Sequence, residues 1–164
     1  MDKSGFNVVL VEPEIPPNTG NVGRLCLATG SALHLVKPLG FSLEDRQLKR
    51  AGLDYWKNVD LRTWDSFAEL QAAQPADSRY FFLTTKTERA YYNVKFQRGD
   101  FLVFGPETKG LPEHLLATGV DNPEMIGARE PFRSCITIPM QGARSLNLAT
   151  AVAIVLFEAV RQQR

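Results

Sequence analysis

The sequence predicts an α/β fold, with a mostly parallel sheet that is covered by helices on both faces. Short apolar runs alternate along the chain with segments of helical periodicity, which is the pattern of βα units. Two runs, at residues 80–83 and 101–104, are apolar at every position, as strands buried on both faces are. The 164 residues contain no internal repeat or low-complexity linker, which predicts one domain over residues 1–164.

The elements of the first half follow from turn and cap signals. Glu12-Pro-Glu-Ile-Pro-Pro17 forces an extended loop before a helix, and Gly30 is a good left-handed terminator of that helix. Ser42-Leu-Glu-Asp45 resembles a capping box that opens a short helix to Arg50, which Gly52 ends. Strands are expected at residues 6–11, 33–36 and 59–63, and helices from Asn18 or Thr19 to Gly30, from the capping box to Arg50, and at 65–73.

In the second half, strands are expected at residues 79–85, 100–104 and 136–138. Pro112 suits the first turn of a short helix at 114–117. Residues 121–134 contain Asn-Pro, Gly and Glu-Pro, which indicates an inserted loop. A last helix is expected from Leu146 to about Arg161.

This last helix is apolar almost all round, because only Thr150 is polar between Leu148 and Phe157. A helix that covers one face of a sheet shows a polar stripe, so burial on a second side is expected. We predict a two-fold homodimer through this helix, with Val155 as an example of an interfacial residue. The alternative is a central helix of a compact monomer.

Composition limits the partners and the compartment. The net charge is +1, so a polyanion must be met by a local basic patch. The chain has no stretch long enough for a membrane span and no signal-peptide core, which predicts a cytoplasmic protein without a membrane partner. Cys26 and Cys135 are then free thiols, and neither has a partner at metal-ligand spacing, so no metal is expected.

Two common catalytic patterns do not assemble. Gly20-Asn-Val-Gly23 is neither a dinucleotide-binding fingerprint nor a phosphate-binding loop. His34 falls inside a strand pattern and His114 inside a helix pattern, and neither has a serine in a nucleophile elbow. We interpret His34 as a half-buried strand residue and His114 as a solvated helix residue.

Three segments rich in glycine, proline and asparagine point instead to a ligand site. Phe104-Gly-Pro-Glu-Thr-Lys-Gly-Leu-Pro112 follows a buried strand, and Ile138-Pro-Met140 with Arg144-Ser-Leu-Asn-Leu148 follows the last strand. Asn18-Thr-Gly-Asn21 lies near the start. Ligand sites of α/β proteins form where strands release such loops, although Gly-Pro-Glu-Thr-Lys-Gly alone also suits a surface turn.

These motifs resemble the three ordered motifs of the SPOUT methyltransferases. Glu12-Pro-Glu-Ile-Pro-Pro-Asn-Thr-Gly-Asn21 and Arg50-Ala-Gly-Leu-Asp-Tyr55 resemble, more closely, the small tRNA 2′-O-methyltransferases that act on the wobble pyrimidine of leucine tRNAs. The resemblance covers nearly the whole chain. It implies a C-terminal deep trefoil knot, S-adenosyl-L-methionine bound in a bent form with S-adenosyl-L-homocysteine as product, a tRNA substrate and a homodimer.

The resemblance also implies residues that bind the cofactor. Leu83, Gly105 and Ile138 match positions that wrap the adenosine through backbone groups, and a side chain at Gly105 would block the ligand. Backbone amides at Ser145, Leu146 and Asn147 match groups that hold adenine or the methionine end. Glu107 is expected to order its loop by accepting backbone hydrogen bonds, with a plain surface carboxylate as the alternative.

Arg24 matches the arginine that related ribose methyltransferases place beside the target 2′-hydroxyl. A guanidinium keeps its proton in proteins, so the conservative role is to clamp the adjacent phosphate and stabilise the developing alkoxide. A structural arginine at a helix end is the alternative. Arg144 and Lys86 are candidates for phosphate contacts, and together these cations outline the local patch that RNA requires.

Two other functions stay open. One is a SPOUT enzyme for another tRNA position or for ribosomal RNA, although such enzymes commonly carry an extra RNA-binding domain. The other is a non-catalytic dimeric RNA-binding protein. A protein that had lost its cofactor site would carry bulky residues at positions 105 and 110, whereas this chain has Gly105 and Gly110. Phe157 stands where close relatives often carry tyrosine, so any role of that hydroxyl is absent from this chain.

Overall fold

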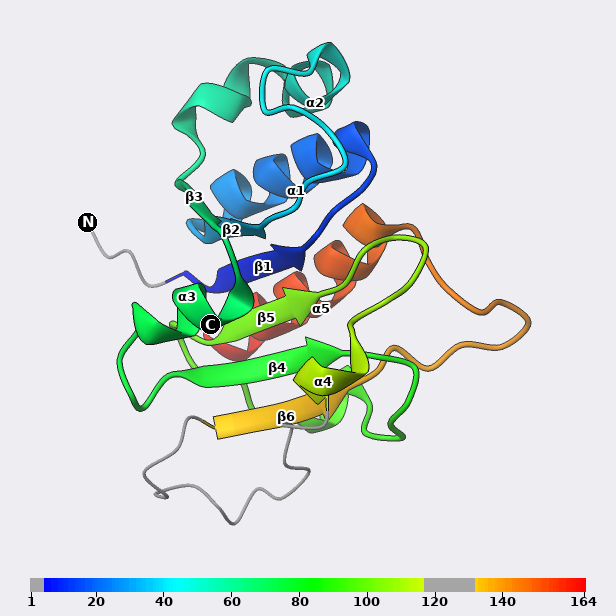
Figure 1. Ribbon diagram of the computed structural model, residues 1–164. Helices are drawn as coiled ribbons and strands as arrows, with labels where there is room; N and C mark the ends of the chain where they lie inside the picture. Colours follow the sequence, from blue (N-terminus) through cyan, green and yellow to red (C-terminus); the bar gives the residue numbers. More distant parts are fainter. Residues whose placement is uncertain (1–4, 117–131) are drawn as a thin grey trace.

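The computed structural model describes residues 5–116 and 132–164, which form one parallel six-stranded sheet with helices on both faces (Figure 1). The predicted fold class is therefore confirmed. The strands lie in the order β3-β2-β1-β5-β4-β6, and every pair is parallel. Their bounds are β1 Asn7–Val11, β2 Ala32–Val36, β3 Leu61–Trp64, β4 Arg79–Leu83, β5 Phe101–Phe104 and β6 Phe132–Ile136.

The helices bury two separate apolar layers against this sheet. Side chains of α1 and α5 pack with one face of the strands, and side chains of α3 and α4 pack with the other. Alternate residues of a strand point to opposite faces, so Val8 and Leu10 belong to the first layer while Val9 and Val11 belong to the second. The helices are α1 Pro16–Thr29, α2 Arg46–Gly52, α3 Phe67–Ala72, α4 Glu113–Leu116 and α5 Leu148–Gln162, with 3₁₀ helices η1 Leu53–Asn58 and η2 Tyr91–Asn93.

Helix α1 begins at Pro16, earlier than predicted. Pro16 and Pro17 occupy the first helical positions, where a missing N–H removes no helical hydrogen bond. The helix ends at Gly30 as predicted, and Gly30 takes the left-handed conformation with φ 66°.

Helix α2 begins at Arg46 and not at the expected capping box. The Asp45 carboxylate accepts hydrogen bonds from the backbone N–H groups of Gln47 and Leu48. The Ser42 hydroxyl accepts only from the N–H of Glu44, within the preceding turn. Asp45 therefore caps this helix, and Ser42 belongs to the loop.

The last strand lies earlier than predicted. It covers Phe132–Ile136 instead of 136–138, and it pairs with β4 from Arg79 to Leu83. Residues 132–134, assigned to an inserted loop from the sequence, are therefore part of the sheet. The rest of that predicted loop, and residue 117 of the predicted helix 114–117, lie outside the described residues.

Helix α5 begins at Leu148, two residues later than predicted, and it buries one face within its own chain. Val155 is fully buried in that face, so its assignment as an interfacial residue is wrong. The outward face nevertheless carries apolar side chains between exposed Thr150 and Arg161, with Phe157 46% exposed and Ile154 half-buried. An apolar surface therefore remains on α5, at other residues than expected.

His34 is fully buried rather than half-buried. Its Nδ1 accepts a hydrogen bond from the indole N–H of Trp64 at 3.0 Å, so its Nε2 carries the proton and donates to Asn7 Oδ1 at 2.9 Å. Burial lowers the pKa of His34 to about 4, because the charged form would lose its hydration. This histidine is a neutral part of the core.

Both cysteines are free and buried, and burial raises the pKa of the Cys26 thiol. Within residues 5–116 and 132–164, no helix has the length and hydropathy needed to cross a membrane. The same part of the chain contains no cluster of His, Cys, Asp and Glu that is suited to hold a metal ion.

Candidate functional site

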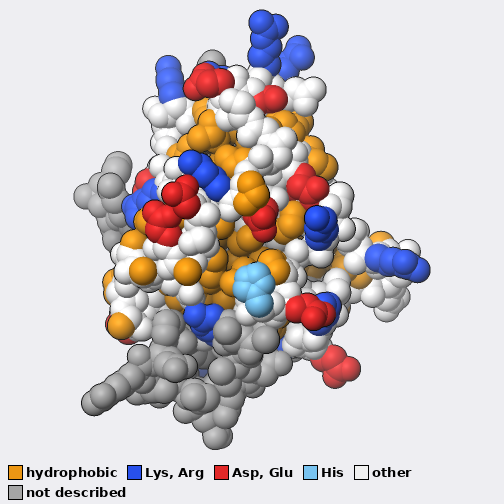
Figure 2. All heavy atoms as spheres, in the orientation of Figure 1, with side chains coloured by type: hydrophobic (Ala, Val, Ile, Leu, Met, Phe, Trp, Pro, Cys, Tyr) orange, Lys and Arg blue, Asp and Glu red, His pale blue; other side chains and the backbone are white. Residues whose placement is uncertain are grey.

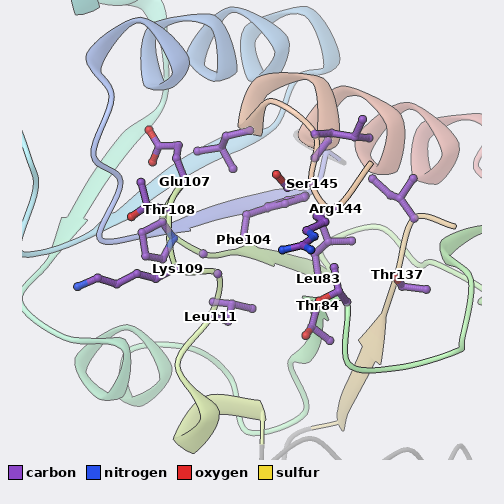
Figure 3. Close-up of a pocket in the computed structure, with 18 of the residues that line it drawn as sticks. Leu83, Thr84, Phe104, Glu107, Thr108, Lys109, Leu111, Thr137, Arg144 and Ser145 are labelled. Carbon is purple, nitrogen blue, oxygen red and sulfur yellow. The ribbon is translucent and has the colours of Figure 1, made fainter. Parts of the chain in front are cut away.

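A cavity of about 370 Å³ lies at the carboxyl ends of β4, β5 and β6 (Figure 3). Four segments enclose it, and each follows a strand or precedes a helix: residues 83–86, 104–111, 137–140 and 144–148. Carboxyl ends of parallel strands meet at one edge of a sheet, which brings these segments together. The sequence prediction of a ligand site at this edge is consistent with the cavity.

The cavity wall combines apolar surface with polar groups. Its apolar side chains are suited to a flat aromatic ring, and its hydroxyls and cations are suited to a charged, hydrogen-bonding group. The apolar members include Leu83, Phe104, Leu111, Ile138, Met140, Leu146 and Leu148, and the polar members include Thr84, Thr85, Thr108, Lys109, Thr137, Arg144 and Ser145.

Gly105 lies in the cavity wall, and the packing of its own loop also requires glycine at this position. A Cβ at this position would lie 2.3 Å from the backbone carbon of Gly110 and 2.3 Å from the nitrogen of Leu111. Gly110 itself has φ 68°, which favours glycine. The loop after β5 therefore folds back on itself. A larger residue at position 105 would force this loop into another conformation.

Glu107 fixes this loop to the loop that precedes α1. Its carboxylate accepts hydrogen bonds from the backbone N–H of Glu14 at 2.8 Å and of Ile15 at 2.6 Å. It also accepts one from the Asn18 amide at 3.3 Å. The sequence predicts that Glu107 accepts backbone hydrogen bonds, and in the structure the backbone donors belong to the distant loop 12–17.

Glu14 makes the reciprocal contact. One carboxylate oxygen of Glu14 accepts from the backbone N–H of Thr108 at 3.0 Å and from its hydroxyl at 2.7 Å. These hydrogen bonds stabilise the carboxylate and lower the pKa of Glu14. We call the four residues Glu14, Ile15, Glu107 and Thr108 the 14/107 clamp.

Asn147 does not belong to the cavity wall. Its side-chain oxygen caps α5 by accepting from the N–H of Thr150 at 3.2 Å, and its amide donates to Asn18 at 2.9 Å. Asn18 in turn contacts Glu107. The side chains of Asn18 and Asn147 therefore tie the start of α1 to the start of α5 and to the clamp.

The three candidate cations occupy different places. Arg144 is exposed in the cavity wall. Lys86 is also in the wall, but its Nζ lies 2.7 Å from the Glu113 carboxylate, which lowers the pKa of Glu113. Arg24 is exposed on α1 outside the cavity wall, with its guanidinium 5.6 Å from the ring centre of Tyr55.

Sequence reasoning missed Glu14 and Thr108. Glu14 lies in a proline-rich loop, 94 residues before its partner, and no local pattern connects the two. Both loops are rich in small and polar residues, and this pattern could identify the two segments. It could not predict that Glu14 and Thr108 contact each other.

The fold and the cavity define a parallel α/β protein with a candidate small-molecule site where its strands end. The 14/107 clamp holds the loop after β5 to the loop before α1, beside this site. The sequence profile of the SpoU rRNA Methylase family matches residues 5–157. The chain belongs to the SpoU methylase family.

Relatives that share one enzyme name match almost the whole chain. A tRNA (cytidine(34)-2′-O)-methyltransferase of Burkholderia ambifaria is 47% identical over 161 residues, which cover 96% of this chain and 95% of that protein. The enzyme of the same name from Yersinia pestis is 47% identical, with 96% and 93% covered.

Solved structures agree with the fold. One, described as structural insights into the 2-OH methylation of C/U34 on tRNA, has a TM-score of 0.87 and 45% identity, with 99% of this chain and 98% of that chain covered. A putative RNA methyltransferase from Bacillus anthracis has a TM-score of 0.82 and 44% identity, with 97% and 94% covered. An AdoMet-bound rRNA methyltransferase from Sinorhizobium meliloti shares the fold, with a TM-score of 0.81 and 24% identity over 99% and 58%.

Proposed function

We propose that this protein transfers a methyl group from S-adenosyl-L-methionine to the ribose 2′-hydroxyl of nucleotide 34 in tRNA, and releases S-adenosyl-L-homocysteine and the proton of that hydroxyl. The observation that carries the proposal is a cavity at the strand ends of a chain with 47% identity to enzymes named for this reaction. The same proposal includes a single domain over residues 1–164, the trefoil knot that the family resemblance implies, and action in the cytoplasm.

The cavity suits the proposed cofactor, which when bound supplies a methyl group on a positively charged sulfonium. Leu83 and Ile138 offer apolar surface and strand-end backbone groups to an adenosine, as the family resemblance implies. Ser145 and Leu146 lie in the wall just before α5, where backbone N–H groups are not used by the helix. Glu107, through the clamp, holds the loop that forms the opposite wall.

Arg24 is proposed to act on the RNA. A 2′-hydroxyl is a weak nucleophile, and negative charge develops on its oxygen as it attacks. A guanidinium beside this oxygen stabilises that charge and holds the adjacent phosphate in a fixed orientation. Arg144, in the cavity wall, is proposed to contact a phosphate, and Lys86 to do so after exchanging its Glu113 partner.

A homodimer through α5 is part of the proposal. The outward face of α5 carries half-buried Ile154 and exposed Phe157, and exposed Leu146 precedes the helix. Arg24 lies outside the cavity wall of its own chain, so a second copy is a means to bring the guanidinium and a cofactor together.

We predict that Phe157→Glu weakens the dimer, because the new carboxylate would have to be buried against the partner without a compensating charge. Light scattering at micromolar concentration is expected to show a dimer for the wild type and a monomer for the variant. Ala72→Glu is the matched control, since residue 72 is exposed on α3 at the opposite face of the sheet. A wild-type monomer, or a Phe157→Glu dimer, would refute the proposed interface.

The proposed reaction is tested with labelled S-adenosyl-L-methionine and two RNA pools, total tRNA and ribosomal RNA, from cells that lack this enzyme. We expect label in tRNA alone. Label in ribosomal RNA alone would favour the alternative enzyme class, and binding of tRNA without any transfer would favour a non-catalytic RNA-binding protein.

A further inference from the structure

The surface formed by α2 and η1 carries a local excess of positive charge. Residues 46–58 contain four cations, Arg46, Lys49, Arg50 and Lys57, against one acid, Asp54, in a chain whose net charge is only +1. In Figure 2, lysine and arginine side chains gather at the top of the molecule, where Figure 1 places α2 and η1. This charge has no role in the cavity described above.

These cations are available to an external ligand. Lys49 pairs with Glu44 at 2.6 Å, and both side chains are exposed. Arg46, Arg50 and Lys57 are exposed and form no ion pair with any side chain that the structure describes. Exposed ion pairs are weak, so a polyanion would displace Glu44 at little cost.

Tyr55 is an exposed aromatic ring within this charged surface. It is 45% exposed, and the Arg24 guanidinium lies 5.6 Å from its ring centre. A cation at this distance from a tyrosine ring is attracted to it. Tyr55 is thus adjacent to the residue that we propose to meet the target ribose.

The backbone beside Tyr55 is anchored by the next residue, Trp56. The Trp56 ring packs so closely on α1 that a Cβ at Gly23 would lie 2.7 Å from it. Gly23 therefore allows η1 to lie directly on the helix that carries Arg24. Anchoring the backbone next to Tyr55 reduces the entropy that this segment loses when a ligand stacks on the tyrosine ring.

We propose that Tyr55 is a stacking platform for an unpaired RNA base next to the target nucleotide, and that Arg46, Arg50 and Lys57 bind the flanking phosphates. An aromatic ring among unpaired cations is the combination that binds single-stranded nucleic acid, since bases stack on the ring and phosphates meet the cations. A double helix keeps its bases stacked on each other, so the fitting occupant is a single-stranded loop. This inference rests on the proposed function and adds the surface that selects a loop.

The test measures binding of an anticodon stem-loop RNA, with 2-aminopurine beside nucleotide 34, to the full protein with S-adenosyl-L-homocysteine. We expect Tyr55→Ala to weaken binding by roughly 5- to 150-fold and to remove the fluorescence change due to stacking. Tyr55→Phe keeps the ring and should bind within about twofold of the wild type. The matched control is Tyr92→Ala, because Tyr92 is 55% exposed on η2.

Salt dependence separates the two roles. Arg50→Ala and Lys57→Ala are each expected to lower the slope of log affinity against log salt by about one, whereas Tyr55→Ala should leave it unchanged. Wild-type binding by Tyr55→Ala, an equal loss in Tyr55→Phe, or unchanged slopes in both cation variants would overturn the inference and leave an acidic protein as the occupant to test. If the wild type does not bind the stem-loop, the proposed function is refuted as well. If the wild type methylates tRNA and Tyr55→Ala binds the stem-loop normally, only the stacking role of Tyr55 is refuted.

Discussion

Arg24→Ala is expected to lower the single-turnover rate of methyl transfer by roughly 10²–10³-fold, the usual effect of removing one group that stabilises transition-state charge. Arg24 is exposed, and among the residues that the structure describes its guanidinium lies over the ring of Tyr55, so the fold, the dimer and cofactor affinity should persist. Arg24→Lys keeps the charge and loses the planar fork, and should recover part of the rate. Saturating tRNA and cofactor ensure that weaker RNA binding cannot imitate slower chemistry. An unchanged rate in Arg24→Ala would leave the residue structural and move the catalytic role to Arg144.

A mixed dimer shows which cavity Arg24 serves. Ser145→Trp is designed to fill the cavity from an exposed position in its wall, without touching Arg24. If Arg24 acts in the cavity of the partner, a dimer of one Arg24→Ala chain and one Ser145→Trp chain keeps one intact site and about half of the wild-type rate. If Arg24 acts in its own chain, neither site is intact and the mixed dimer is inactive.

Glu107→Ala is expected to loosen both loops of the 14/107 clamp. It removes the acceptor of three hydrogen bonds, two of them from backbone N–H groups. Because water replaces part of these contacts, we expect a loss of about 2–3 kcal/mol in the free energy of unfolding. The cofactor must then order the loop when it binds. If this ordering costs about 1.4–2.8 kcal/mol of binding free energy, the affinity for the cofactor falls by roughly 10- to 100-fold.

Calorimetry with S-adenosyl-L-homocysteine and thermal unfolding check this expectation. Glu107→Gln keeps one accepting oxygen without the charge and should fall between the wild type and Glu107→Ala. Glu113→Gln is the control, because it removes an exposed carboxylate whose solvent-screened pair with Lys86 contributes little to stability. Equal cofactor affinity in Glu107→Ala and the wild type would show that the clamp does not shape the site.

The sequence predicted best those elements whose residues follow one uninterrupted pattern, such as a continuous apolar run or a glycine at a helix end. Residues 101–104 are apolar at every position because β5 lies between β1 and β4 and is covered on both faces. Gly30 ends α1 because the left-handed conformation there favours glycine. Strand β6 was misplaced because Ser134 interrupts its apolar pattern, although this serine is buried and accepts a hydrogen bond from Arg89.

The candidate site was only partly predictable, because its geometry depends on contacts between distant segments. The strand-end loops were identified from glycine and proline content, and the structure gathers them around one cavity. The contact of Glu107 with the loop before α1 spans about ninety residues, and no local pattern encodes it. The same is true of Asn147, whose side chain caps α5 and binds Asn18 instead of lining the cavity.

The central claim, methylation of the ribose at nucleotide 34, is tested most directly by alkaline hydrolysis of tRNA labelled by this protein. Alkali cleaves RNA through the free 2′-hydroxyl, so a methylated ribose leaves a resistant dinucleotide. We predict that the label appears in the alkali-resistant dinucleotide formed by nucleotides 34 and 35. Label in mononucleotides, which indicates methylation of a base, or in a resistant dinucleotide from another position would contradict the account.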